Sequence, residues 1–151
     1  MGASQEKVPV LLMVSGGSDS VAMLELACAY RDGEGAEQDD VLLHMIASSL
    51  PTPHDIELGV LHVNHMLRGE DADSDEQFVR DKCAALGVEC WVERVDIASL
   101  AKASKDGMEA VARKERYRLA EQALEHMGGA NLQGVICTAH TLDDRIETFF
   151  M

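Results

Sequence analysis

The sequence predicts an α/β fold in which an open, mainly parallel sheet carries helices on both faces. Two observations support this prediction. Short apolar runs of strand length alternate along the chain with longer segments of helical periodicity. Polar stretches follow the apolar runs, and open parallel sheets bind their ligands at such positions, beyond the carboxyl ends of the strands. The length of 151 residues is enough for one core, so we expect a single domain over residues 1–151.

The first strand and the loop after it organise the rest of the chain. The apolar run Val10–Val14 is followed by a short loop of serine, glycine and aspartate: Ser15, Gly16, Gly17, Ser18, Asp19 and Ser20. Glycine lets an anion approach closely, and the free N–H groups of a following helix attract it. Because Asp19 would repel a phosphate unless a cation lay between them, we interpret the loop as a pyrophosphate cradle with Mg²⁺ nearby. It is not a Walker loop, since it contains no lysine. The alternative is a tight turn in which Ser18 or Asp19 caps the helix.

The next elements follow from helical spacing and strand-like runs. A helix is expected over 20–31, a second over 40–50, and a strand over 56–63. That strand ends in a polar stretch, where His62 and His65 alone do not make a zinc site because no further ligand has suitable spacing. The alternative for this stretch is a polar turn closed by Gly69.

Capping and periodicity predict three helices and a strand in the following part of the chain. Ser74 and Gln77 have the spacing of a capping box, for a helix that ends at Gly87. A strand over 88–95, a short helix over 97–104 and a long helix over 108–127 come next. One face of the long helix carries Glu109, Arg113, Arg116 and Tyr117. This face is either a solvated Glu–Arg ladder or a clamp for phosphate or substrate.

A fourth strand, over 134–139, precedes a polar segment and a further predicted helix. Asp143 and Asp144 would suit the N-terminus of that helix on capping grounds alone. Asp143 and Glu147, four residues apart, would share a helical face, and such carboxylates also suit Mg²⁺ or an ammonium group. Because the chain stops at Met151 inside this helix, we expect it to be a fragment.

Composition restricts the class of protein and of partner. The formal net charge of −14, taken alone, argues against binding of nucleic acid through its phosphates, which needs basic patches. The charge is uneven, however: residues 31–57 hold seven acids and one arginine, whereas residues 113–118 hold four of the 13 basic residues. No apolar run reaches the length needed to cross a membrane, and the N-terminus has no signal peptide pattern. The cysteines lack Cys-x-x-Cys spacing and are expected to be buried free thiols in a reducing compartment: Cys28, Cys83, Cys90 and Cys137. We expect a cytoplasmic protein, with an organelle as the alternative, and no membrane partner.

Four motifs, in order, resemble those of one enzyme family. They are Ser15–Ser20, His62–His65 with Leu67-Arg68 and Ser74-Asp75, Glu109–Tyr117, and Thr138–His140 with Asp143-Asp144 and Glu147-Thr148. Together they resemble the catalytic domain of the tRNA(Ile)-lysidine synthetase family, which belongs to the PP-loop (N-type) ATP pyrophosphatases. The resemblance implies a Rossmann-like, adenine nucleotide alpha hydrolase-like PP-loop fold, truncated at its C-terminus, with the C-terminal tRNA-binding regions absent.

The resemblance also implies an activity. ATP would adenylate C2 of the wobble cytidine of tRNA(Ile), and the amine of lysine would then displace AMP. The cofactors implied are ATP and Mg²⁺, the substrates tRNA(Ile) and free lysine, and one option for assembly is a homodimer.

Residue by residue, the resemblance assigns three kinds of role. Nucleotide contacts fall on Ser15, Gly16, Gly17, Ser18, Asp19, Ser20, His62 and Val63. Substrate contacts fall on His65, Arg68, Arg116 and Tyr117. Catalytic roles fall on Asp19, Arg113, His140, Asp143, Asp144 and Glu147. A metal ion would be held by Asp19, Asp143 and Asp144.

This chain departs from the family pattern, and two rival functions stay open. Arg145 stands where the family often has glutamine or a small residue, and the acidic segment 31–57 is longer than the usual connection. A sister PP-loop enzyme, such as a tRNA thiolase or a GMP-synthetase-like amidotransferase, would share the loop. A non-catalytic nucleotide-binding module would share the fold but would not need the cluster from His140 to Glu147.

Overall fold

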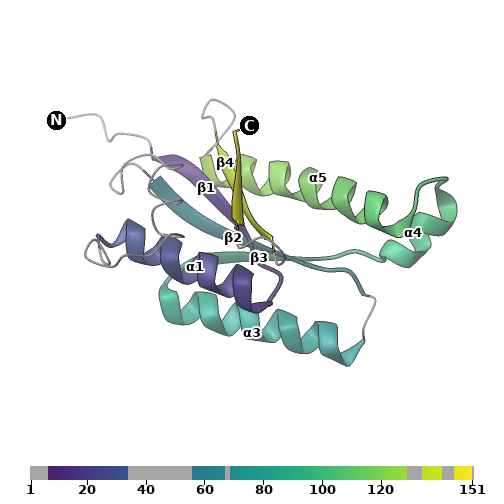
Figure 1. Ribbon diagram of the computed structural model, residues 1–151, viewed down its shortest axis with the longest axis horizontal. Coiled ribbons are helices and arrows are strands. Elements are labelled where there is room, and N and C mark those ends of the chain that lie inside the picture. The colour runs from purple at the N-terminus through teal and green to yellow at the C-terminus, as the bar shows by residue number, and fades with distance from the viewer. Residues whose placement is uncertain (1–6, 34–55, 67–68, 129–133, 141–144, 151) are drawn as a thin grey trace.

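The computed structural model describes residues 7–33, 56–66, 69–128, 134–140 and 145–150, and for 128, 140 and 145–150 it describes the backbone alone. These residues form five strands and four helices (Figure 1). In chain order they are β1 (Val8–Met13), α1 (Ser18–Arg31), β2 (Ile56–Asn64), α3 (Glu70–Leu86), β3 (Glu89–Arg94), α4 (Ile97–Ala103), α5 (Met108–Gly128), β4 (Val135–His140) and β5 (Arg145–Phe150). No helix of the described ranges combines the length and the apolar character that crossing a membrane requires.

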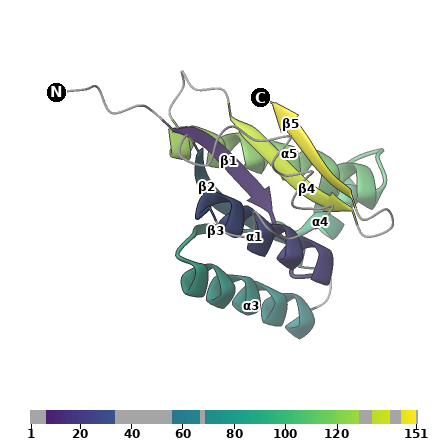
Figure 2. The same ribbon diagram turned by 60° about the vertical axis from the view of Figure 1, so that its left-hand side comes forward.

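The strands form one open sheet in the order β3-β2-β1-β4-β5. β1 pairs in parallel with β2 and β4, and β2 pairs in parallel with β3, whereas β5 runs antiparallel to β4. Figure 2 shows β1 and β4 side by side, with β5 beyond them. The prediction of an open, mainly parallel sheet is therefore confirmed. Its central strand is a continuous apolar run because both of its faces are covered.

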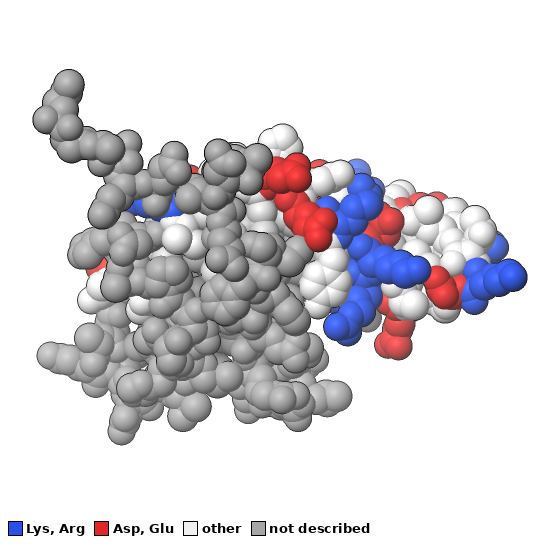
Figure 3. Space-filling model, turned by 90° about the horizontal axis from the view of Figure 1, so that it is seen from above, with Lys and Arg blue, Asp and Glu red and all other residues white. Residues whose placement is uncertain are grey.

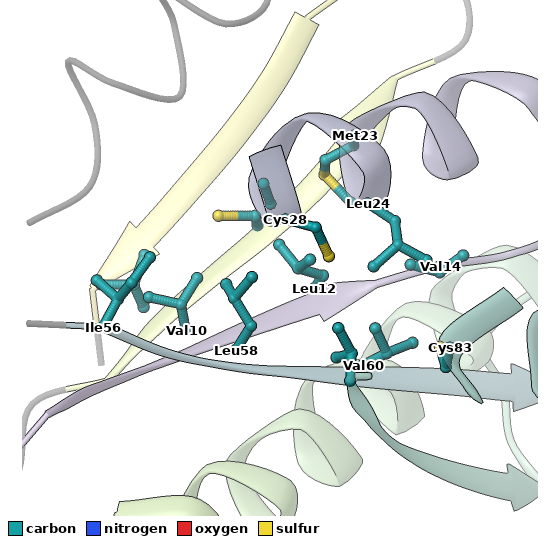
Figure 4. Close-up of a cluster of buried hydrophobic side chains, with 14 of the residues drawn as sticks. Val10, Leu12, Val14, Met23, Leu24, Cys28, Ile56, Leu58, Val60 and Cys83 are labelled. Atoms are coloured by element: carbon teal, nitrogen blue, oxygen red, sulfur yellow. The ribbon is translucent and has the colours of Figure 1, made fainter. Parts of the chain in front are cut away.

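Helices cover both faces of the sheet, as predicted. Apolar side chains of α1 and α3 pack with one face of β1, β2 and β4, around Leu12, Leu24 and Val60 (Figure 4). The second half of α5 packs on the other face, around Leu11 and Leu61. Figure 1 shows this layering, with α1 and α3 on one side of the strands and α5 on the other. The prediction of buried cysteines without disulfides is confirmed for Cys28, Cys83 and Cys137, whereas Cys90 is only half-buried.

Two predictions about helices are wrong. The capping box at Ser74 does not start α3, which begins one turn earlier at Glu70, after Gly69. Three acids in that first turn favour the earlier start because they complement the positive end of the helix dipole. The other error concerns residues 145–150, which form strand β5 and not a helix. This segment is rich in β-branched and aromatic residues, which favour strands, and it pairs with β4 along its whole length.

Other element bounds agree with the sequence to within two residues. α1, α4, α5 and β1 to β4 all occur where expected. The helix predicted over 40–50 lies outside the described residues.

Candidate functional site

A cleft of about 530 Å³ opens at the carboxyl ends of β1, β2 and β4, beside the first half of α5. Many of the residues predicted to form a site line it: Ser15, Gly17, Asp19, Ser20, Val63, His65, Arg113, Arg116 and Tyr117. The carboxyl edge of the sheet is therefore where the loop, the end of β2 and the arginines of α5 meet. The cleft thus lies at the edge where an open parallel sheet is expected to bind a ligand.

The loop between β1 and α1 is held in shape by its own serines. The Ser20 hydroxyl donates to the Gly17 carbonyl at 2.9 Å and accepts from the Gly16 amide at 3.2 Å. The Ser15 hydroxyl lies 3.3 Å from that of Ser20 and also accepts from the Gly17 amide, at 3.3 Å. Gly16 has a φ of 100°, which strongly favours glycine. The shape of the loop is thus held by hydrogen bonds within the loop itself.

The N-terminus of α1 faces the cleft without a side-chain cap. Gly17 is the N-cap residue and makes no side-chain cap hydrogen bond, so the alternative of a cap by Ser18 or Asp19 is wrong. Among the described residues, none accepts a hydrogen bond from the amides of Ser18, Asp19 or Ser20. A helix end of this kind is a site for an anion.

Two carboxylates lie at this loop. Asp19 is half-buried and lines the cleft. Asp75 of α3 lies on the other side, where a Cβ added to Gly16 would be 3.4 Å from the Asp75 Cβ. Asp75 is not among the predicted site residues, although it stands in one of the four motifs. Within the described ranges, no three His, Cys, Asp or Glu residues converge as a metal site.

Consecutive residues at the end of β2 point to opposite faces of the sheet. The His62 side chain is only 3% exposed, and its Nδ1 lies 2.8 Å from the Val14 carbonyl oxygen. This contact holds the backbone directly before the loop. Val63 and His65 line the cleft on the other face. The side chain of His62 is therefore a support of the loop, while contact of the backbone at 62–63 with adenine stays a prediction.

His65 lines the cleft, and its surroundings favour the uncharged imidazole. Burial lowers its pKa from the ordinary 6.5, and the positive charge of Arg116 and the neighbouring His62 lower it further. The uncharged imidazole offers one donor and one acceptor to a ligand.

One face of α5 supplies positive charge to the cleft. Glu109, Arg113, Arg116 and Tyr117 all line it, which confirms that they share a face. The Arg113 guanidinium lies 5.5 Å from the centre of the Tyr117 ring. Among the described residues no ion pair joins Glu109 to Arg113, so the ladder interpretation is not supported. The clamp interpretation fits the cleft.

A buried polar network of Asn64, Glu76 and Arg94 lies on the opposite face of the sheet. It was not predicted from the sequence. Glu76 is 6% exposed and accepts two hydrogen bonds of 3.0 Å from Arg94. The Asn64 amide donates to Glu76 at 3.4 Å and to Asp73 at 3.1 Å, and its oxygen accepts from the Met66 amide at 2.9 Å. Hydrogen bonds from Arg94 lower the pKa of Glu76 to about 2. The network ties α3 and β3 to the turn that carries His65.

The remaining predicted residues are placed only in part. Arg68, Asp143 and Asp144 lie outside the described residues. His140 ends β4 and pairs with Arg145, and Glu147 lies in β5 opposite Thr138, which lines the cleft. The helical spacing that related Glu147 to Asp143 is therefore absent. The convergence of these groups on the cleft stays a prediction.

Comparison with known proteins agrees with this geometry. A family model described as a PP-loop domain matches residues 2–151. The chain belongs to the PP-loop domain family. It therefore belongs to a group of ATP-binding domains.

Curated relatives of this PP-loop domain carry one name. A tRNA(Ile)-lysidine synthase of Chlorobaculum tepidum is 40% identical over 139 residues, which are 92% of this chain and 35% of that protein. Proteins of the same name from Clostridium perfringens and Petrotoga mobilis are 34% and 33% identical, over 94% and 92% of this chain. The chain spans 25% to 37% of the length of these three relatives.

Proposed function

We propose that residues 1–151 form the ATP-binding, N-terminal catalytic part of a tRNA(Ile)-lysidine synthetase. The observation that carries the proposal is the single cleft where the serine-glycine loop, His65 and the arginines of α5 meet. The names of the relatives supply the reaction. The product would be tRNA(Ile) with lysine joined to C2 of the wobble cytidine, and the by-products AMP and pyrophosphate.

The loop and α5 would hold the triphosphate. The amides at the start of α1 would donate to a phosphate bound there, and the Ser15 and Ser20 hydroxyls would lie beside it. Arg113 and Arg116 would neutralise charge that develops on the phosphates when pyrophosphate leaves. Asp19 fits a Mg²⁺ ion, which is commonly held by one or two carboxylates together with phosphate oxygens. The bound ion would supply charge neutralisation.

The reaction needs activation because the oxygen on C2 of cytosine is a poor leaving group. In the first step this oxygen attacks the α-phosphorus of ATP, and pyrophosphate leaves. In the second step the lysine amine attacks C2, the carbon–oxygen bond breaks, and AMP leaves. The amine must first lose a proton from its ammonium form, and we assign its uptake to the cluster of His140, Asp143, Asp144 and Glu147 by the resemblance. Neutral His65 and Tyr117 would contact the substrate at the rim.

The thiolase alternative has less support. Sulfur transfer usually needs paired cysteines, and none of the four cysteines lines the cleft. Three of them are buried and Cys90 is half-buried.

The decisive test is transfer of labelled lysine. The protein is incubated with ATP, Mg²⁺, labelled lysine and tRNA(Ile), and label in the tRNA is followed with time. Label that enters the tRNA only when ATP is present is expected. Turnover of ATP with no label in the tRNA would reject the proposed reaction and leave a PP-loop enzyme of another specificity.

A variant tests the part of the proposal that concerns Asp144. Asp144→Asn is expected to keep the fold and much of the ATP affinity but to cut lysine transfer by about 100-fold or more, the scale of losing a positioned acid–base group. Transfer at the parent rate, at saturating lysine and Mg²⁺, would contradict the role assigned to Asp144.

A further inference from the structure

Two of the four free cysteines meet across the turn that joins α3 to β3. Cys83 lies in the last turn of α3 and Cys90 is the second residue of β3, with six residues between them. The chain doubles back at Cys83 because Gly87 adopts a φ of 70° and the Val88 amide donates to the Cys83 carbonyl at 3.0 Å. Val88 and Cys90, two residues apart, then face the same core cluster as Cys83. The local fold therefore brings the two thiols together.

The two thiols are hydrogen-bonded to each other. Cys83 is 1% exposed and packs inside the core cluster of the α1/α3 face, whereas Cys90 is half-buried at the border of that cluster. Cysteines whose side chains already touch have the closeness that a disulfide demands. The pair is thus placed for a disulfide, with one thiol partly open to solvent and the other enclosed.

The shared hydrogen bond gives the two thiols different chemistry. It raises the pKa of Cys83, and burial raises that pKa further. The same hydrogen bond lowers the pKa of Cys90, and the nearby positive charge of Arg80 also lowers it. The thiolate is the reactive form of cysteine, so the more exposed thiol of the pair is also the one that forms it more readily.

Cys28 of α1 is a rival partner for Cys83, because it is buried in the same cluster. Within the described structure, however, the Cys28 and Cys83 thiols share no hydrogen bond. Cys28 is also 3% exposed, so a pair of Cys28 and Cys83 would have no thiol within easy reach of solvent. The geometry therefore favours the pairing of Cys83 with Cys90.

The pair lies away from the cleft. Cys90 is near the start of β3, whereas the cleft opens at the carboxyl ends of β1, β2 and β4 and is lined by neither cysteine. Figure 1 shows α3 ending on the side of the molecule away from α4, and Figure 3 shows Lys and Arg side chains gathered over the α4–α5 end, beside the cleft. A bond between the two sulfurs would therefore tie α3 to β3 without entering the cleft.

We propose that Cys83 and Cys90 form a redox-active pair, which a low-molecular-weight disulfide of the glutathione type converts into an intramolecular disulfide. In the first step the Cys90 thiolate attacks one sulfur of the small disulfide, whose S–S bond breaks and releases one small thiol. In the second step the Cys83 thiol gives up its proton and attacks the Cys90 sulfur, and the second small thiol leaves. The pair loses two electrons and two protons, which the small disulfide takes up as two thiols. An excess of the small thiol reverses both steps.

The disulfide would act on stability and leave the cleft unchanged. It would join covalently the two elements that the hydrogen bonds from Arg94 to Glu76 already join. A cross-link restricts the unfolded chain, so the oxidised protein should melt at a higher temperature than the reduced protein. Its affinity for an ATP analogue should equal that of the reduced protein.

The test exposes the folded chain to glutathione disulfide, blocks the remaining thiols with an alkylating agent and identifies linked peptides by mass spectrometry. The parent should lose two free thiols, retain no glutathione and give one peptide pair linked through Cys83 and Cys90. Cys83→Ala should stop after the first step and keep one glutathione on Cys90. Cys90→Ala should stay fully reduced, because the enclosed Cys83 thiol cannot start the exchange. Cys28→Ala is the matched control, a buried cysteine of the same cluster, and should form the disulfide as the parent does.

Each other outcome would overturn the proposal in whole or in part. Four free thiols in the parent after the exposure would overturn it, and so would a link that forms only when the chain is unfolded by denaturant. A link between Cys28 and Cys83, or its loss in Cys28→Ala, would overturn the pairing. Equal melting temperatures of the oxidised and reduced parent would overturn the effect on stability.

Discussion

The two faces of the sheet treat polar residues differently at the same carboxyl edge. On the α1/α3 face, His62, Asn64 and Glu76 are buried, and each has hydrogen-bond partners within the protein. On the α5 face, His65 and Arg113 line cavities and form no ion pair with the described residues. Three of these residues, His62, Asn64 and His65, come from the end of β2 and the turn after it. They reach opposite faces because successive side chains of a strand alternate.

The polar groups on the α1/α3 face stabilise the fold, whereas those on the α5 face are placed to bind a ligand. A buried polar group costs free energy unless it is hydrogen-bonded, so the groups on the α1/α3 face stabilise the fold by their pairing. Charged groups that face a cavity are free to bind a ligand of opposite charge. Substitutions on the α1/α3 face should therefore change stability, and substitutions on the α5 face should change activity.

The largest effect on activity is expected at the loop. Gly17 has φ −71° and ψ 160°, which valine tolerates, and an added Cβ would meet only the Ser15 hydroxyl, at 3.6 Å. Gly17→Val should therefore fold but fill the phosphate site, and pyrophosphate release should fall by about 100-fold or more. Release is measured together with thermal unfolding. Gly107→Val is the control, since nothing lies within 4 Å of an added Cβ there. Undiminished release in the Gly17 variant would remove the loop from the active site.

The arginines of α5 give a matched pair on one helix. Arg113 lines the cleft, whereas Arg118 is exposed and pairs with Glu115. Arg113→Met should lower pyrophosphate release by about 100- to 1,000-fold, the scale of losing one group that stabilises transition-state charge. Arg118→Met should release pyrophosphate at the parent rate. Equal losses in the two variants would mean that α5 contributes general charge and no specific contact.

A substitution in the buried network should lower the stability of the protein and leave its affinity for ATP unchanged. Arg94→Met leaves the buried Glu76 carboxylate without its two 3.0 Å hydrogen bonds, which should lower the free energy of unfolding. Affinity for an ATP analogue should stay at the parent value. Denaturant unfolding and analogue titration measure the two quantities. A variant with parent stability and lost ATP affinity would reverse the roles assigned to the two faces.

The same network predicts how stability depends on acid. The pKa of Glu76 is about 2 in the folded state against 4.5 ordinarily, so the unfolded state binds more protons between these values. The stabilisation from Glu76 is therefore complete above about pH 4.5 and is lost as the pH falls toward about 2. Arg94→Met should flatten this part of the curve of unfolding free energy against pH. An unchanged curve would show that Arg94 does not hold the pKa of Glu76 down.

The smallest effect is expected at His65. Burial is the main cause of its lowered pKa, and Arg116 contributes second. Arg116→Met should therefore raise the pKa of His65 only part of the way back toward 6.5, and Arg118→Met should not move it. Because a lowered pKa makes the folded state bind fewer protons, His65 makes stability fall as the pH drops through 6.5. NMR titration of the imidazole measures the shift, and a lower pKa in the Arg116 variant would contradict it.

The sheet and many residues of the cleft lining could be predicted from the sequence because both depend on local patterns. Continuous apolar runs marked β1 and β2, and the alternation of side chains followed from the strands. The shared face of Arg113 and Tyr117 followed from helical geometry alone.

The errors arose where a local pattern competed with another or where contacts were distant in the chain. Ser74 and Gln77 have capping-box spacing, but the acids before them start α3 a turn earlier. Asp143 and Asp144 resemble a helix start, yet residues 145–150 pair with β4. The bonds from Glu76 to Asn64 and Arg94 join residues 12 and 18 apart, a separation that no spacing rule reveals.

Backbone amide NMR of the ¹⁵N-labelled chain with a non-hydrolysable ATP analogue and Mg²⁺ tests the division between the two faces most directly. We expect the analogue to shift the amide signals of residues at the cleft: Gly17, Ser18, Val63 and Arg113. The amides of Glu76 and Arg94 should stay within the noise. Shifts concentrated at Glu76 and Arg94, with the loop unchanged, would contradict the placement of the nucleotide on the α5 face.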